Sequence, residues 1–243
     1  MQLDRQVAII TGAGSGIGAA IARQFAAAGA QVVLVGRRAA ALEEVRASLG
    51  GPHPARVAPA DITDRAAVGA LVEAVAGDYG RIDILVNNAG ANVRARRVAE
   101  LAAEDWERLL TVNATGAFHL AQALLPHMRA RGGGLIINIV STSGVRASVL
   151  AGAAYSAAKH ALAALGRVIA QEERAHGIRV TNIHPGEVNT PILDQRPEPV
   201  SAGQRARALQ PEDVAAAALF VAALPPRACV PELVITPLYQ AFV

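Results

Sequence analysis

Cysteine, aromatic residues and charge are scarce in this sequence of 243 residues. Its one cysteine, Cys229, excludes an intrachain disulfide and favours a reducing compartment. Charged residues make up 18% of the chain, which is too few for a disordered protein. No apolar run reaches the roughly 18 residues of a membrane span, and the start lacks the basic region of a signal peptide. We therefore expect a globular, cytoplasmic protein that binds no membrane.

The basic residues give no sign of a nucleic-acid interface. The net charge is +3, but lysine and arginine are mostly scattered rather than clustered. The densest group, Arg94, Arg96 and Arg97, has no aromatic neighbours for base stacking. We expect no nucleic-acid partner and no metal site.

Short β-branched runs alternate with longer alanine-rich segments of helical spacing along the whole chain. Strands are expected at 7–11, 31–35, 55–58, 82–86, 135–139, 178–183 and 233–236. Helices are expected at 16–28, 39–49, 65–76, 104–128, 154–176 and 211–223. Pro126 should end or kink the fourth of these helices.

This alternation predicts an α/β fold with a single domain spanning 1–243. Several strands are apolar on successive residues, which is typical of strands covered on both faces. Right-handed crossovers then give a Rossmann-type, doubly wound parallel sheet of about seven strands with helices on both faces. The most irregular segment, 189–210, is expected to cover a substrate site.

A glycine-rich turn lies between the first strand and the first helix. Gly12 allows a tight turn, and Gly16 and Gly18 allow close approach of the backbone to a pyrophosphate at the helix N-terminus, with Ser15 and Ile17 between them. The spacing G-x-x-x-G-x-G differs from the common G-x-G-x-x-G, and a tight turn without a ligand is the alternative.

The end of the second strand bears on cofactor choice. It carries no carboxylate that would favour NAD, and Arg37 can pair with the 2′-phosphate of NADP. We therefore expect NADP(H), with NAD(H) as the alternative. Arg37 and Arg38 could instead be exposed charges at a helix start.

Two further turns are expected to contact the adenosine part of such a cofactor. Asp61 and Ile62 follow the third strand, where the adenine ring would lie. Asn88, Ala89 and Gly90 follow the fourth strand and leave room for the ribose and pyrophosphate. Each is also explained by ordinary turn chemistry.

Tyr155 and Lys159 stand four residues apart at the start of a helix and therefore share one face. A nearby ammonium would lower the phenol pKa from ~10 towards neutrality, as an acid/base catalyst needs. Ser141 follows the fifth strand and could polarise a substrate oxygen. Asn113 is a polar residue in an apolar helix, and it could simply bond its own backbone.

Together these motifs resemble the short-chain dehydrogenase/reductase family. The resemblance spans 11–190 and rests on the glycine turn, Asn87-Asn88-Ala89-Gly90, Asn113, Ser141 with Tyr155 and Lys159, and Pro185-Gly186 with Thr190. The C-terminal segment 232–240 departs from the family, because it lacks the usual glycine-rich turn after the last strand.

The resemblance implies a role for each of these residues. Tyr155 would be the general acid/base, and Ser141 would orient the carbonyl. Lys159 would lower the tyrosine pKa and bond the nicotinamide ribose, while Asn113 would hold a water that links Lys159 to solvent. Pro185, Gly186, Val188 and Thr190 would hold the nicotinamide. The resemblance also implies a homodimer or homotetramer.

We therefore predict an NADP(H)-dependent carbonyl reductase or alcohol dehydrogenase. A catalytically silent dinucleotide-binding regulator is the main alternative, although none of Ser141, Tyr155 and Lys159 is lost. Epimerisation or dehydration of a nucleotide sugar is a third possibility. It is less favoured, because enzymes of that kind usually carry a longer C-terminal substrate domain.

The substrate is expected to be a small carbonyl or alcohol compound in a mostly apolar pocket. Arg94 or Arg146 could instead hold an anionic group, and reduction of a 3-oxoacyl thioester or oxidation of a hydroxy acid remains open. The expected pocket wall is Val93, Arg94, Ser143, Val145, Leu150, Glu187 and Ile192.

Overall fold

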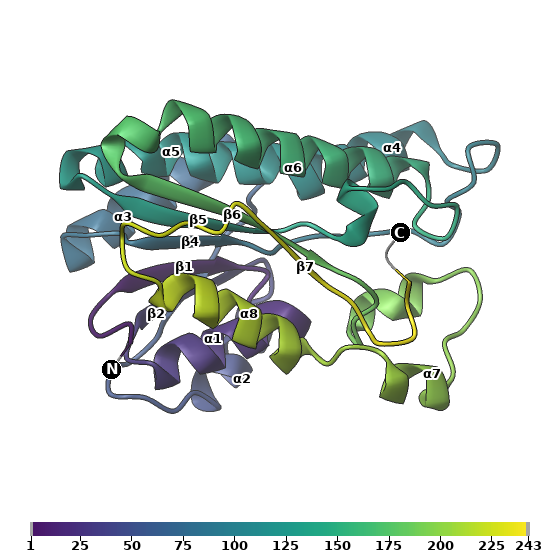
Figure 1. Ribbon diagram of the computed structural model, residues 1–243, viewed down its shortest axis with the longest axis horizontal. Helices are drawn as coiled ribbons and strands as arrows, with labels where there is room; N and C mark the ends of the chain where they lie inside the picture. The colour runs from purple at the N-terminus through teal and green to yellow at the C-terminus, as the bar shows by residue number, and fades with distance from the viewer. Residues whose placement is uncertain (1, 242–243) are drawn as a thin grey trace.

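The computed structural model describes residues 2–241, and its central feature is a seven-stranded sheet in the order β3-β2-β1-β4-β5-β6-β7 (Figure 1). Every neighbouring pair is parallel, which confirms the predicted doubly wound fold. The strands are β1 Val7–Thr11, β2 Gln31–Gly36, β3 Arg56–Pro59, β4 Ile84–Asn87, β5 Gly134–Ile139, β6 Ile178–Pro185 and β7 Glu232–Ile235. The strand order reverses between β1 and β4, where such sheets bind ligands.

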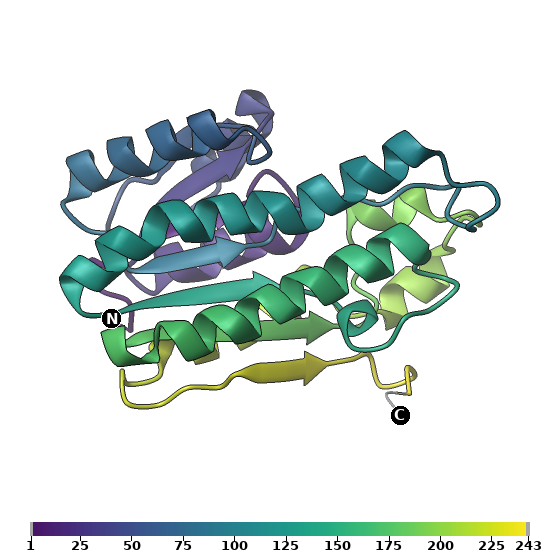
Figure 2. The ribbon, with the colours of Figure 1, turned by 90° about the horizontal axis from the view of Figure 1, so that it is seen from above.

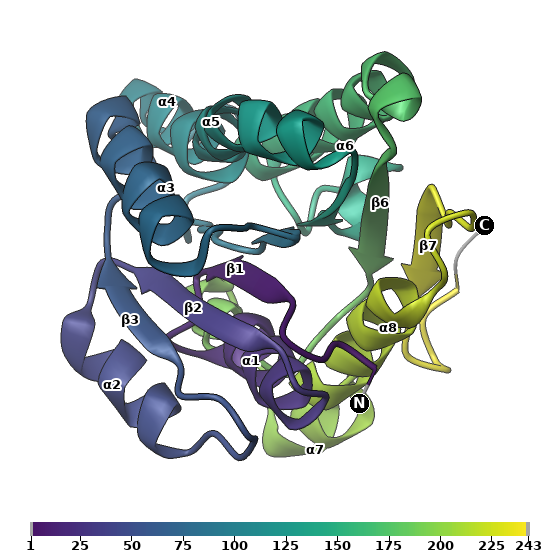
Figure 3. The same ribbon diagram turned by 90° about the vertical axis from the view of Figure 1, so that its left-hand side faces the viewer.

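Helices cover both faces of the sheet (Figure 3). One face carries α3 Arg65–Tyr79, α4 Ala103–Leu110, α5 Gly116–Arg131 and α6 Ala153–Glu172. The other carries α1 Gly16–Ala27, α2 Ala39–Ala47 and α8 Pro211–Ala223. The short α7 Ala202–Arg207 lies beyond the carboxyl ends of the strands (Figure 2). None of the helices in residues 2–241 is long and apolar enough to cross a membrane.

The two covered faces explain the uninterrupted apolar runs of the strands. In β1, Ala8 and Ile10 pack into the core on one side, and Val7 and Ile9 pack into the core on the other. All four side chains are fully buried. Alternate residues of this strand therefore pack into two separate cores, so a polar side chain is unfavourable on either face of the strand.

The long helix expected over 104–128 is interrupted, but not where Pro126 predicts. A π-helical turn, Thr111–Thr115, separates α4 from α5, and α5 continues past Pro126 to Arg131. Proline has no backbone N–H, so the Gln122 carbonyl loses its helical hydrogen bond. Both Gln122 and Pro126 are exposed, so this carbonyl can bond water instead. Leu124 and Met128 are buried on either side and hold the helix against the sheet.

The segment 189–210 is more regular than expected. It contains the 3₁₀ turn Pro191–Gln195 and the helix α7. A capping box starts α7, because the Ser201 hydroxyl accepts from the Gln204 amide and the Gln204 side chain accepts from the Ser201 amide.

Candidate active site

A cavity of about 1750 Å³ opens at the carboxyl ends of the strands. It exceeds the roughly 300–1,000 Å³ of an ordinary small-ligand pocket, so it has room for a large cofactor and a substrate together. Gly18 and Asn113 lie behind its wall. All other predicted site residues line it: Gly12, Ser15, Gly16, Ile17, Arg37, Asp61, Ile62, Asn88, Ala89, Gly90, Ser141, Tyr155, Lys159, Pro185, Gly186, Val188 and Thr190.

Asn88 packs tightly against the glycine-rich turn. Its side-chain amide donates to the carbonyl oxygens of Thr11 at 2.9 Å and Gly12 at 3.3 Å. A Cβ on Gly18 would lie 2.5 Å from both Asn88 Nδ2 and the Gly12 oxygen. Gly12 adopts a φ of +63°, in the left-handed region that favours glycine. Glycine at 12 and 18 therefore lets the turn close against β4.

The turn directs the start of α1 into the cavity. Ser15 caps the helix with extended backbone, and its side chain makes no capping hydrogen bond, so the first-turn amides are left to a ligand. On the other side of the cavity, Asp61 accepts from the backbone and hydroxyl of Thr63 at 2.9 and 2.8 Å. These bonds, helped by the charge of Arg37, hold the Asp61 pKa below its usual range. Arg37 itself is exposed.

Tyr155 and Lys159 lie together on the first turns of α6. The Lys159 ammonium is 5.6 Å from the centre of the Tyr155 ring and donates to the Ile139 carbonyl at 2.9 Å. Burial lowers the Lys159 pKa to about 8. Burial also raises the Tyr155 pKa to about 12, against the opposing effects of Ser141 and Arg96. This direction is opposite to the one expected from sequence, because desolvation outweighs the neighbouring charges.

Ser141 follows β5 by two residues and, like Tyr155 and Lys159, lines the cavity. Its hydroxyl accepts from the Ser143 amide at 3.1 Å, and a hydrogen bond with Tyr155 lowers the Tyr155 pKa. The carbonyl of Ser141 accepts from the His184 ring at 3.0 Å. The residue is therefore fixed through both its side chain and its backbone.

Asn113 lies in the π-helical turn and is almost fully buried. Its amide donates to the carbonyls of Leu109 and Ala91, and its oxygen accepts from the Ala91 amide. Asn113 thus bonds the backbone of its own helix, which was the alternative to a functional role, and it also binds both backbone groups of Ala91, the residue after Gly90. A Cβ on Gly90 would lie 2.8 Å from its oxygen.

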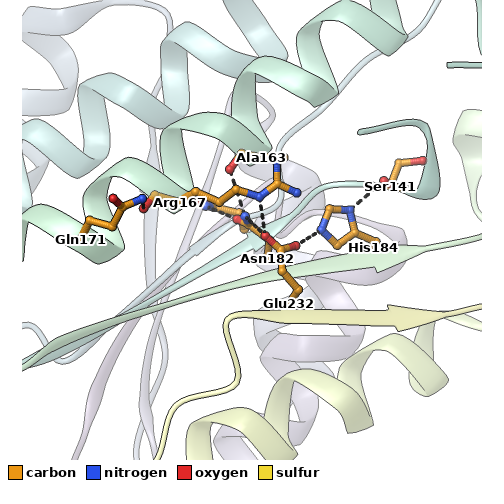
Figure 4. Close-up of polar contacts among 8 residues, drawn as sticks. Ser141, Ala163, Arg167, Gln171, Asn182, His184 and Glu232 are labelled. Carbon is orange, nitrogen blue, oxygen red and sulfur yellow. Dashed lines mark hydrogen bonds and ion pairs between the residues drawn. The ribbon is translucent and has the colours of Figure 1, made fainter. Parts of the chain in front are cut away.

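A buried polar network supports Ser141 from behind (Figure 4). His184 on β6 is fully buried, and its Nε2 faces the carboxylate of Glu232 at the start of β7. Glu232 also accepts from Asn182 at 3.1 Å and from Arg167 on α6 at 2.8 Å. The two ring nitrogens of His184 thus face two oxygen atoms, the Ser141 carbonyl and the Glu232 carboxylate. No spacing pattern along the chain predicts this network.

Sequence reasoning missed several residues of the cavity wall, among them Arg96, Tyr239 and Gln240. Arg96 is buried, whereas we had considered it only as part of a basic surface group. Tyr239 and Gln240 belong to the atypical C-terminal segment and reach the cavity, where Gln240 accepts from the Glu187 amide at 2.9 Å. Of the pocket-wall residues expected from sequence, all but Val145 line the cavity. Arg146, considered as an anion-binding residue, is not among the lining residues.

Comparison with known proteins finds dehydrogenases and reductases. The family model described as short chain dehydrogenase matches residues 6–200. D-threitol dehydrogenase of Mycolicibacterium smegmatis is 38% identical over 232 residues, which cover 91% of this chain and 87% of that protein.

Two solved structures show the same fold over nearly the whole chain. The alcohol dehydrogenase of Thermococcus sibiricus, complexed with 5-hydroxy-NADP, has a TM-score of 0.88 at 28% identity and covers 99% of this chain and 100% of its own. The 3-ketoacyl-(acyl-carrier-protein) reductase of Brucella melitensis, complexed with NADH, has a TM-score of 0.87 at 32% identity, with coverages of 97% and 98%.

Proposed function

Because this chain belongs to the short-chain dehydrogenase family, we propose that it transfers a hydride between NADP(H) and the carbonyl or secondary alcohol carbon of a small substrate. The observation that carries this proposal is the meeting of Ser141, Tyr155 and Lys159 with the start of α1 in one cavity. A silent dinucleotide-binding regulator has no use for such a set, so it is not favoured.

The cavity fits a nicotinamide dinucleotide. The glycine turn is closed enough to exclude a Cβ at Gly18, and the uncapped helix start offers amide donors to a pyrophosphate. Arg37, Asp61 and Ile62 line the cavity, and we propose that Arg37 would pair with the 2′-phosphate while Asp61 and Ile62 would hold the adenine. On the nicotinamide side, the wall is formed by Pro185, Gly186, Val188 and Thr190.

The bound nicotinamide supplies the hydride for reduction of a carbonyl carbon, or accepts one from an alcohol. In the reductive direction Tyr155 donates the proton to the carbonyl oxygen, and its raised pKa keeps that proton in place at neutral pH. The Ser141 hydroxyl donates a hydrogen bond to the same oxygen and stabilises its developing charge. Lys159, held by the Ile139 carbonyl, places a positive charge beside the phenol.

The direct test is oxidation of NADPH by the purified protein with a panel of small ketones and aldehydes, followed by absorbance. Turnover with at least one carbonyl compound is expected. NADPH binding without turnover of any carbonyl or alcohol would instead favour the silent regulator.

Arg37 is expected to set the preference for NADP(H). Replacing Arg37 with alanine removes a charge-assisted bond worth about 1.5–3 kcal/mol, so NADPH should bind roughly ten- to a hundredfold more weakly while NADH binding is unchanged. Nicotinamide fluorescence titration measures both affinities. Arg46→Ala, an exposed arginine farther along α2 that pairs with Glu43, is the matched control. Equal weakening for both cofactors would contradict the role of Arg37.

The segment 189–210 is proposed to cover the substrate. It is tied to the cavity wall by the Arg196–Glu187 ion pair at 2.7 Å and by the Gln195 carbonyl, which accepts from Arg96. The Thr190 side of the segment contacts the glycine turn, because a Cβ on Gly16 would lie 3.1 Å from Thr190 Cγ2. It therefore links the two ends of the site.

We expect the protein to form a homodimer or homotetramer. Trp106 on α4, Phe118 on α5 and Val168 on α6 are exposed apolar residues on neighbouring helices (Figure 2). Light scattering at micromolar concentration should give a mass of two or four chains, and Phe118→Arg should shift it towards one. A wild-type monomer would contradict the expectation.

A further inference from the structure

Arg96 joins three separate segments at the substrate end of the cavity. Its Nε donates to the Val93 carbonyl at 2.8 Å, Nη1 to the Leu150 carbonyl at 2.6 Å and Nη2 to the Gln195 carbonyl at 2.5 Å. These bonds use three of the five guanidinium N–H groups. Two donors therefore remain, on Nη1 and Nη2.

The charge of Arg96 is not neutralised. The residue is only 7% exposed, yet no carboxylate within residues 2–241 comes within 4.0 Å of it. Its three partners are neutral carbonyls, which satisfy hydrogen bonds but leave a buried positive charge, an arrangement that is costly in a protein. A buried positive charge without a carboxylate partner is open to pairing with a bound anion.

A second arginine lies near Arg96. Arg196 is paired with Glu187 at 2.7 Å, so this part of the wall holds two guanidinium groups and one carboxylate. Burial, and then the charge of Arg196, lower the Arg96 pKa below its usual range. The local excess of positive charge would be balanced by one negative group.

The backbone at Gly152 makes space for Arg96. Gly152 has a φ of +87°, and a Cβ there would lie 2.5 Å from the Cβ of Arg96. Gly152 directly precedes α6, which carries Tyr155 three residues later. Arg96 and Tyr155 both line the cavity, so the cation belongs to the same site as the reacting phenol.

We propose that Arg96 binds a carboxylate of the substrate, so that the preferred substrates are small hydroxy acids and oxo acids. This inference rests on the proposed hydride transfer and names its substrate class. The carboxylate anchors the substrate and takes no part in the redox step. In the oxidative direction, hydride would leave the carbinol carbon for NADP⁺, and the hydroxyl proton would pass to the phenolate form of Tyr155, which must first release its own proton to solvent. The sequence had favoured a neutral ketone or aldehyde, with Arg94 or Arg146 as the anion-binding alternative.

The test compares matched substrates that differ in charge. With NADP⁺, we would measure kcat/KM for 2-hydroxybutanoate and 3-hydroxybutanoate, each beside its methyl ester. At least one acid should exceed its ester tenfold or more. Arg96→Met should remove that preference by lowering kcat/KM for the acid about a hundredfold and for the ester less than threefold. Arg97→Met, at the neighbouring exposed position, should keep the preference.

A purely structural role for Arg96 predicts a different result. If Arg96 only ties the three segments together, Arg96→Met and Arg96→Lys should lower activity on acid and ester equally, and that outcome would overturn the proposal. As an anion anchor, Arg96→Lys should keep a reduced preference for the acid. If Arg96→Met does not fold, the wild-type comparison and Arg96→Lys decide.

The same experiment separates this inference from the proposed function. Turnover of the esters without any preference for the acids refutes the carboxylate anchor and leaves hydride transfer standing. Failure to turn over any carbonyl or alcohol, with NADPH bound, refutes the proposed function itself.

Discussion

Replacing Tyr155 with phenylalanine is expected to lower kcat by about 10²–10⁴-fold, the usual contribution of a positioned acid/base group. Tyr155 lies on the first turn of α6 and lines the cavity together with Ser141 and Lys159. Among the described residues of that turn, its phenol is the one side-chain proton donor that lines the cavity. Its pKa is raised to about 12 by burial, so the proton is present throughout the neutral range. Phenylalanine keeps the ring and removes only the hydroxyl group that carries the proton.

Binding measurements make this result specific. NADPH fluorescence should show an affinity within about threefold of the wild type, because the ring that fills the site is unchanged. Tyr79→Phe is the matched control, since Tyr79 ends α3 and does not line the cavity. A Tyr155→Phe enzyme that retains more than a tenth of the wild-type kcat would show that another group supplies the proton.

The fold was predictable because its signals are local and repeat along the chain. Several strands, such as β1, are apolar on successive residues because they serve two cores, and that pattern can be read without contacts. The glycine turn was predictable for the same reason, since Gly12 and Gly18 are the residues that its geometry requires. Boundaries moved by a few residues, as at α3, which runs on to Tyr79.

The interruption of the long helix was not predictable from local preference. Pro126 is the strongest helix-breaking residue in the segment, but its ring is exposed and its neighbours Leu124 and Met128 are buried, so packing keeps the helix intact. The true break, at Thr111–Thr115, has no helix-breaking residue. It coincides with Asn113, whose side chain bonds Ala91 on a segment distant in sequence.

Burial was the main quantity that the sequence could not supply at the site. The spacing of Tyr155 and Lys159 placed them together, but desolvation reverses the expected shift of the Tyr155 pKa. Arg96 looked like one of three surface arginines, and only the fold shows that it is buried while Arg94 and Arg97 are exposed. The partners of Arg96 lie on three segments, at Val93, Leu150 and Gln195, so no short sequence window contains them.

Removing the carboxylate of Glu232 should destabilise the protein and loosen Ser141. Glu232→Ala leaves His184 without the acceptor at Nε2, in a fully buried position. Leaving a buried polar group unpaired costs about 1–3 kcal/mol, and the lower half of that range is expected because the Glu232 side chain is itself 35% exposed. Urea unfolding near neutral pH measures the loss. Glu43→Ala, which breaks the exposed pair with Arg46, should cost less than about 1 kcal/mol.

The pH dependence of this loss distinguishes the network from simple packing. Burial raises the Glu232 pKa, but bonds from Asn182, His184 and Arg167 outweigh it and hold that pKa below 4.5. A carboxyl group with a lowered pKa stabilises the folded state above its unfolded pKa, and this contribution is lost as the pH falls through the folded value. The difference between wild type and Glu232→Ala should therefore be largest at neutral pH and shrink in acid below that value. A difference that stays constant with pH would mean that Glu232 acts through its methylene groups alone.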